Sequence, residues 1–106
     1  MPPLSSERVF DALADPTRRR IVERIAKAPA TAGELAARLP ITRQAVVKHL
    51  AILEAAGLAE GERDGRRVIY KLTPAPFVEA TTWMHSVGAA WDRRVANLER
   101  SLKKKR

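Results

Sequence analysis

The stretch from Thr31 to Gly57, TAGELAARLPITRQAVVKHLAILEAAG, limits the possible folds more than any other part of the chain. It predicts two helices joined by a tight turn. Thr31 can cap the first helix, and Glu34 stands three residues later, where its side chain can reach back to the amide of Thr31 and complete a capping box. Pro40 ends this helix, because the residue before a proline is pushed out of the α region. Thr42 can then cap a second helix, which Gly57 can end in the left-handed conformation.

The second helix is predicted to have two unlike faces. Its inner face is apolar, with His49 at the edge, and comprises Val46, Leu50 and Leu53. Its outer face is polar and basic and comprises Arg43, Gln44, Val47, Lys48 and Ala51. Two capped helices joined by a three-residue turn, with Arg and Gln at the start of the second, are what a helix-turn-helix needs to enter a DNA major groove. An ordinary helical hairpin with a solvated polar face would give the same pattern.

The length of 106 residues suits a single domain, spanning residues 1–106. The net charge of +8 points less clearly to nucleic acid than it first suggests, because residues 93–106 hold seven of the basic residues and one acid. The position of arginines in the folded part is therefore more informative. The absence of cysteine excludes disulfides, thiolate metal sites and cysteine nucleophiles. With no membrane-spanning run and no signal peptide, we expect a cytoplasmic protein without a membrane partner.

Two helices are expected before the central stretch. Ser5 or Ser6 can cap the first, which ends near Ala14 and has apolar positions at Val9, Phe10 and Leu13. Asp15 and Pro16 can begin the second as N-cap and first helical residue. Arg18, in its first turn, is expected to project inward and pair with an acid such as Asp11 or Glu23. Residues 28–30 are expected to form a loop.

A β-hairpin is predicted directly after the two central helices. Asp64 and Gly65 are a strong signal for a two-residue turn, and apolar residues alternate along the returning strand from Val68 to Leu72. The tip gathers three arginines: Arg63, Arg66 and Arg67. Exposed hairpin tips are often charged for solubility alone. The position after a helix-turn-helix favours a wing that lays arginines along the DNA backbone or into the minor groove.

A long helix is predicted from about Phe77 to the end of the chain. Its apolar residues recur in steps of three and four, and they include two tryptophans. This stripe exceeds what one small domain can bury, so a homodimer is expected. The expected interface residues are Phe10, Leu13, Trp83, Val87, Trp91, Val95 and Leu98. The alternative is that the helix folds back on its own domain, which suits its first half better than the part beyond Trp91.

Four ordered motifs together resemble the ArsR/SmtB family of winged-helix repressors. They are FDALADPTRRRIV (Phe10 to Val22), TAGELA (Thr31 to Ala36), TRQAVVKHLAILEAAGL (Thr42 to Leu58) and DGRRVIYKL (Asp64 to Leu72). The resemblance implies a homodimer built on the first and last helices and binding to a palindromic operator in double-stranded DNA. It implies DNA-reading roles for Arg43, Gln44, Val47 and Lys48, and wing roles for Arg63, Arg66 and Arg67.

The chain departs from the metal-sensing members of this family. Those members often carry cysteines in the helix before the turn, where this chain has Glu34 to Leu39 without any. Others use carboxylates and histidines on the last helix. There His85 is the only histidine, and the acids Glu79, Asp92 and Glu99 lie six, seven and fourteen residues from it, which are not one-turn spacings. The chain therefore resembles the metal-independent branch, and we expect no metal, no cofactor and an inducer that the sequence does not identify.

The sequence thus predicts a mainly α protein with a small β-hairpin, a winged helix-turn-helix with about five helices and a two-stranded wing. We expect a sequence-specific DNA-binding regulator, an autorepressor by resemblance. Arg43 suits a guanine edge, Gln44 an adenine edge and Val47 a thymine methyl, while Lys48, Thr42 and the wing arginines suit phosphates. The alternative is a winged helix used only for protein–protein interaction, which would favour acids or apolar residues on the exposed face. An enzyme is disfavoured, since the chain lacks a nucleophile–base pair, a carboxylate pair and a phosphate-binding glycine loop.

Overall fold

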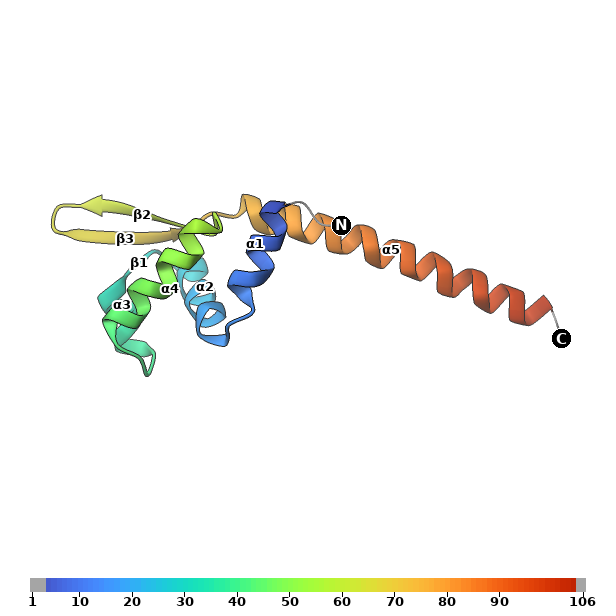
Figure 1. Cartoon of the computed structure of the whole chain (residues 1–106), viewed down its shortest axis with the longest axis horizontal. Helices are drawn as coiled ribbons and strands as arrows, with labels where there is room; N and C mark the ends of the chain where they lie inside the picture. Colours follow the sequence, from blue (N-terminus) through green and yellow to red (C-terminus); the bar gives the residue numbers. More distant parts are fainter. Residues whose placement is uncertain (1–3, 105–106) are drawn as a thin grey trace.

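The computed structural model describes residues 4–104, which form five α-helices and three β-strands (Figure 1). In chain order the elements are α1 (Leu4–Leu13), α2 (Pro16–Lys27), β1 (Ala30–Thr31), α3 (Ala32–Arg38), α4 (Arg43–Ala55), β2 (Ala59–Asp64), β3 (Arg67–Leu72) and α5 (Ala75–Lys104). The predicted winged helix-turn-helix fold is confirmed. Residues 1–3 and 105–106 of the predicted domain lie outside the described part.

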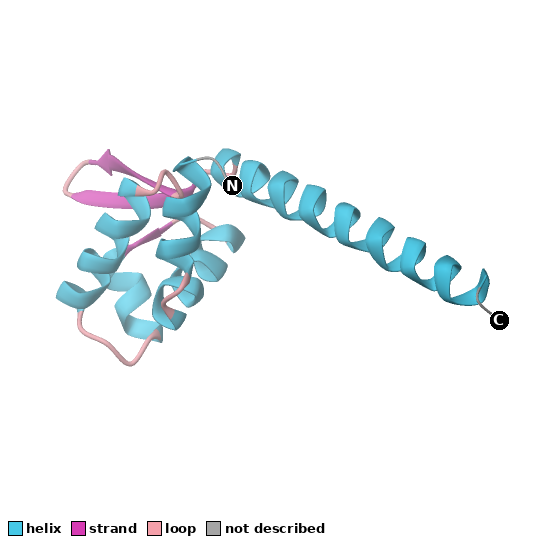
Figure 2. Cartoon of the chain, turned by 45° about the vertical axis from the view of Figure 1, so that its right-hand side comes forward, coloured by secondary structure: helices cyan, strands magenta, loops and turns pink. Residues whose placement is uncertain are grey.

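Helix α5 extends away from the other elements, which gather at its N-terminal end (Figures 1 and 2). The molecule consequently measures 71 × 25 × 20 Å along its principal axes. Among the helices, α5 packs mainly against α1. Its buried contact with the domain includes Ala80, whereas residues 84–102 of α5 are all exposed.

The sheet is antiparallel, with its three strands in the order β1-β3-β2. Ala30 of β1 pairs with Tyr70, and Thr31 pairs with Ile69. The prediction of a loop over residues 28–30 was therefore wrong at Ala30. A strand of two residues has no alternation to detect, and its hydrogen-bonding partner lies about forty positions further along the chain.

Most helix ends follow the capping signals. Asp15 caps α2 with Pro16 at its first position, and Gly57 takes a left-handed φ of 76° just after α4. The prediction that Ser5 or Ser6 caps α1 was wrong. Because α1 already begins at Leu4, both serines lie within the helix, and Ser6 is fully buried.

Two boundaries near the sheet also differ from the predicted ones. The last pair of the hairpin joins Asp64 to Arg67, so the two turn residues are Gly65 and Arg66 rather than Asp64 and Gly65. Gly65 has a φ of 63°, which a residue with a side chain rarely adopts. Helix α5 begins at Ala75, two residues earlier than predicted, because a proline such as Pro76 is tolerated within the first helical turn.

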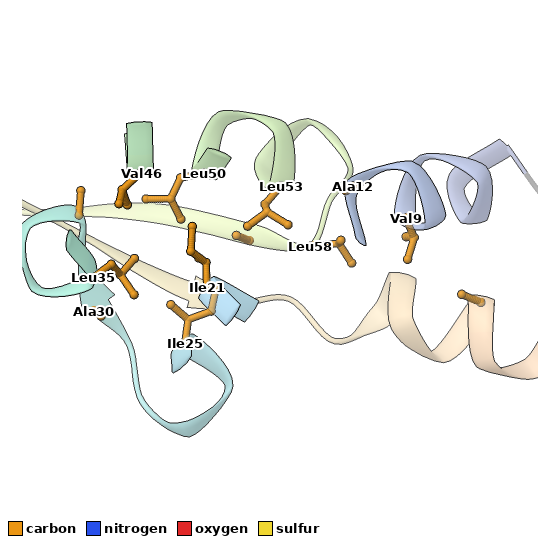
Figure 3. Close-up of a cluster of buried hydrophobic side chains, with 13 residues drawn as sticks. Val9, Ala12, Ile21, Ile25, Ala30, Leu35, Val46, Leu50, Leu53 and Leu58 are labelled. Carbon is orange, nitrogen blue, oxygen red and sulfur yellow. The ribbon is translucent and has the colours of Figure 1, made fainter. Parts of the chain in front are cut away.

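The hydrophobic core holds α4 against the other helices (Figure 3). The inner face of α4 is completely buried, as predicted, at Val46, Leu50 and Leu53. These side chains pack in one cluster with residues of α1, α2 and α3, with Leu58 just before β2 and with the first residue of β2. The cluster includes Val9, Ala12, Ile21, Ile25, Leu35, Leu58 and Ala59. The packing of one face leaves the opposite face of α4 pointing away from the domain.

Candidate nucleic-acid interface

The turn between α3 and α4 is built from the predicted caps. At the start of α3, Thr31 Oγ1 accepts the Glu34 N–H at 3.1 Å, and Glu34 Oε1 accepts the Thr31 N–H at 3.1 Å. At the start of α4, Thr42 Oγ1 accepts the Ala45 N–H at 3.1 Å. These hydrogen bonds satisfy amides that a helix start leaves unpaired, so the two helices are positioned by their own sequence.

The predicted reading face of α4 is open to solvent. Arg43, Gln44 and Lys48 are exposed, and the side chain of Val47 has an exposed fraction of 44%. Arg43 and Gln44 are the first two residues of the helix. In a docked helix-turn-helix, the N-terminal residues of the second helix are those that approach base edges.

Arg18 links the back of α4 to the first two helices. Its Nε donates to the carbonyl of Ala12 at 2.6 Å and its Nη2 to that of Asp11 at 3.3 Å, while its Nη1 lies 3.5 Å from His49 Nδ1. The predicted pairing of Arg18 with an acidic side chain was therefore wrong. Carbonyls at the C-terminal end of a helix carry partial negative charge, which attracts the guanidinium.

His49 lies in a small polar cluster at this junction. Its Nδ1 is 4.0 Å from Asp15 Oδ2, and its side chain is 23% exposed. Asp15 Oδ2 also accepts the Arg18 N–H at 2.9 Å. This backbone hydrogen bond is the main cause that lowers the pKa of Asp15, with the charge of Arg18 also contributing. His49 therefore lies among polar groups at the edge of the inner face of α4, as predicted.

The wing arginines project from an exposed hairpin. Arg63 lies on β2, Arg66 in the turn and Arg67 at the start of β3, and all three are exposed. One hollow is lined by Arg43 and Val47 of α4 and by Arg66 and Arg67 of the wing. The structure therefore brings these four predicted residues together. Its volume is about 360 Å³. Arg63 instead lines a separate hollow with Glu62 and Lys71 on the wing.

Sequence reasoning missed a contact between α3 and the wing. Arg67 Nη2 lies 3.4 Å from Glu34 Oε1, the same oxygen that accepts the Thr31 N–H. The hydrogen bonds with Thr31 are the main cause that holds the pKa of Glu34 low, and the charge of Arg67 adds to them. The two residues are 33 positions apart, and they meet where β1, which leads into α3, pairs with β3.

The predicted dimer residues divide into two groups. Phe10 and Leu13 are half-buried against the core, and the ring of Phe10 lies 5.8 Å from that of Trp83. Further along α5, the predicted residues Val87, Trp91, Val95 and Leu98 are exposed. They lie in a continuous stripe that also includes Met84 and Leu102. The exposed fraction of Trp91 is 63%. Large apolar side chains in such a stripe usually mark a surface that binds another protein.

Within residues 4–104, no group of three or more histidine, cysteine or acidic side chains lies close enough to hold a metal ion. His85 and Asp92 line one hollow on α5 together with Met84 and Gly88, which supply no ligand set for a cation. No helix in the same described range is long and apolar enough to cross a membrane.

The known proteins that this chain resembles in sequence are helix-turn-helix transcriptional regulators. A family model described as a helix-turn-helix domain matches residues 13–62. The chain is 49% identical over 78 residues to the HTH-type transcriptional regulator Rv2034 of Mycobacterium tuberculosis, covering 74% of this chain and 73% of that protein. It is 33% identical over 76 residues to the transcriptional repressor SdpR of Bacillus subtilis, covering 72% and 84%.

The structural comparison agrees over almost the whole chain. An ArsR-like transcriptional regulator from Rhodococcus sp. RHA1 is 38% identical and superposes with a TM-score of 0.80, covering 91% of each chain. A second ArsR family transcriptional regulator, RHA00566, is 30% identical with a TM-score of 0.78, covering 87% of this chain and 97% of that one. The protein therefore belongs to the ArsR/SmtB family of winged helix-turn-helix regulators, and it is a DNA-binding transcriptional regulator.

Proposed function

We propose that this protein is a homodimeric repressor that binds a palindromic operator, with α4 in the major groove and the wing against the DNA backbone. The observation that supports this most directly is the shared hollow in which Arg43 and Val47 of α4 meet Arg66 and Arg67 of the wing. One DNA duplex can contact both elements at once, since a single concave and basic surface joins them. Repression is supported by the similarity to SdpR, which is itself a transcriptional repressor.

The proposed roles follow from side-chain chemistry. Arg43 matches the two acceptors of a guanine edge, Gln44 the donor and acceptor of adenine, and Val47 the methyl group of thymine. Phosphate contacts are assigned to the cations around them and to the start of α4, namely Lys48, Arg63, Arg66, Arg67 and Thr42. These phosphate contacts fix the position of the protein on DNA but carry no sequence information.

The dimer is proposed to form through α1 and α5, so that the 106 residues make one winged helix-turn-helix domain with dimerisation helices at both ends. A monomer would leave the stripe from Met84 to Leu102 in water. A two-fold dimer presents two copies of α4, and such dimers bind half-sites that mirror each other. The operator is therefore proposed to be an inverted repeat.

A binding titration tests this proposal. Labelled duplexes that tile the region upstream of the gene, and scrambled duplexes of the same composition, are titrated with the protein at one salt concentration. We expect one upstream fragment to bind at least a hundredfold more tightly than its scrambled counterpart, with two chains per duplex. Equal affinity for all duplexes would contradict a sequence-specific function, and no affinity for any duplex would favour a winged helix used for protein–protein interaction.

A further inference from the structure

Glu34 occupies an unusual place for an acid, since it lies beside the basic surface proposed to contact DNA. Its carboxylate lies 3.4 Å from Arg67 Nη2, and Arg67 also lines the hollow shared by α4 and the wing. Both side chains are about half exposed, 51% for Glu34 and 61% for Arg67. The pair is therefore open to solvent and to any anion that approaches the wing.

The two partners differ in how firmly they are held. The capping box fixes Glu34 through two hydrogen bonds of 3.1 Å with Thr31: the Glu34 carboxylate accepts the Thr31 N–H, and the Glu34 N–H donates to Thr31 Oγ1. Arg67 stands at the first position of β3, next to the hairpin turn. A flexible guanidinium can leave this carboxylate more easily than the carboxylate can follow it.

We propose that Glu34 is an intramolecular competitor of DNA phosphate: it holds Arg67 in an ion pair within the free protein, and the DNA backbone has to displace it before Arg67 can bind. This inference rests on the proposed function of the wing. The competition follows from charge, because an arginine that is already paired with a carboxylate gains less binding free energy from a phosphate than an unpaired arginine does. A carboxylate at this distance also repels the phosphate that would share the guanidinium.

Glu34→Gln separates this role from the role of Glu34 in folding. Glutamine can complete a capping box as glutamate does, so helix α3 keeps its start while the negative charge is removed. Exposed ion pairs of this kind shift an equilibrium by roughly 1.5- to 5-fold. The DNA affinity of a dimer with two wings should accordingly rise by about 2- to 25-fold at low salt.

The salt dependence gives a second signature. When DNA displaces Glu34 in the wild-type protein, the freed carboxylate can take up a cation, which offsets part of the counterion release from the DNA. Glu34→Gln abolishes this uptake, so the plot of log affinity against log salt should become steeper by up to about one unit per wing. Operator and scrambled duplexes should gain affinity by the same factor, because a phosphate contact does not read sequence.

The experiment is a double-mutant cycle of wild type, Glu34→Gln, Arg67→Ala and the double variant, titrated against both duplexes over a range of salt. Glu34→Gln should raise affinity when Arg67 is present and have little effect when it is absent. Glu60→Gln, which removes the same charge from strand β2 of the wing, is the matched control and should change affinity less. Far-UV circular dichroism confirms that each variant is folded.

Three results would overturn the inference. An equal gain from Glu34→Gln with and without Arg67 would show a general charge effect. A loss of affinity would show that Glu34 orients Arg67 toward DNA. A carboxyl NMR titration of free protein in which Arg67→Ala leaves the pKa of Glu34 unchanged would show that the pair does not form in solution. Failure of the wild-type protein to bind any duplex would instead refute the proposed function itself.

Discussion

Replacing Trp91 by alanine is the sharpest perturbation of the proposed dimer. Trp91 lies near the middle of the exposed stripe on α5, and its exposed fraction of 63% leaves a large apolar surface for a partner. A buried tryptophan covers up to about 250 Å², so roughly 150 Å² of Trp91 remains to be buried in a dimer. At about 25 cal/mol per Å², complete burial contributes up to about 4 kcal/mol in each protomer.

The expected loss is smaller than this upper limit. Alanine keeps part of the contact, and the neighbouring side chains can relax into the space, so we expect about 2 kcal/mol per protomer, typical of a strong interface residue. Two protomers lose about 4 kcal/mol together, which weakens the dimer about a thousandfold. DNA affinity should fall with it, because a monomer can bind only one half-site.

Sedimentation velocity over a range of protein concentrations measures the change directly. Val78→Ala is the matched control: Val78 is on the same helix and 61% exposed, but lies away from the stripe. We expect wild type and Val78→Ala to sediment as dimers at micromolar concentration and Trp91→Ala as a monomer. A monomeric wild type, or a Trp91→Ala variant that dimerises as well as wild type, would refute the reasoning.

Three further predictions concern salt, metal and acid. If a dimer neutralises about eight phosphates, a plot of log DNA affinity against log salt concentration should fall with a slope near 7. The double variant with Arg66→Ala and Arg67→Ala should reduce this slope by a few units. A wild-type slope near zero would contradict the wing assignment. Chelator or stoichiometric zinc should leave DNA affinity unchanged, whereas a zinc-induced loss that His85→Ala abolishes would reveal a metal site. Backbone hydrogen bonds lower the pKa of Asp15 from 3.8 and that of Glu34 from 4.5 in the folded protein. The two carboxylates therefore stabilise the folded state fully when the pH is above 3.8 and 4.5, and this stabilisation is lost as the pH falls through their lowered pKa values. Chemical denaturation at pH 7 and pH 3 should therefore show a smaller acid-induced loss of stability for Asp15→Asn, which can still cap α2, than for wild type.

The parts of the fold that were predicted correctly depend on neighbouring residues. The caps at Thr31 and Thr42 and the left-handed Gly57 each follow from signals within a few positions of one another. The buried face of α4 follows from helical periodicity. Local signals of this kind place the turn and the exposed face without knowledge of the tertiary structure.

The features that were missed depend on partners distant in sequence. Strand β1 exists because Ala30 and Thr31 find β3, and the ion pair of Glu34 with Arg67 follows from the same approach. The inward direction of Arg18 was correctly inferred, but its partners were backbone carbonyls, which every residue possesses and which no sequence pattern marks. The tertiary path of the chain decides these contacts.

The central claim is that the exposed first turn of α4 reads the DNA sequence, and one competition titration tests it most directly. Gln44→Ala and Arg66→Ala are each titrated against operator and scrambled duplexes at the same salt concentration. Loss of a good bidentate base contact costs about 1 to 3 kcal/mol of discrimination, and a symmetric dimer loses it twice. Gln44→Ala should therefore reduce the ratio of operator to scrambled affinity, while Arg66→Ala should lower both affinities and keep that ratio nearly constant. If Gln44→Ala instead changes both affinities by the same factor, the exposed face of α4 does not read the sequence.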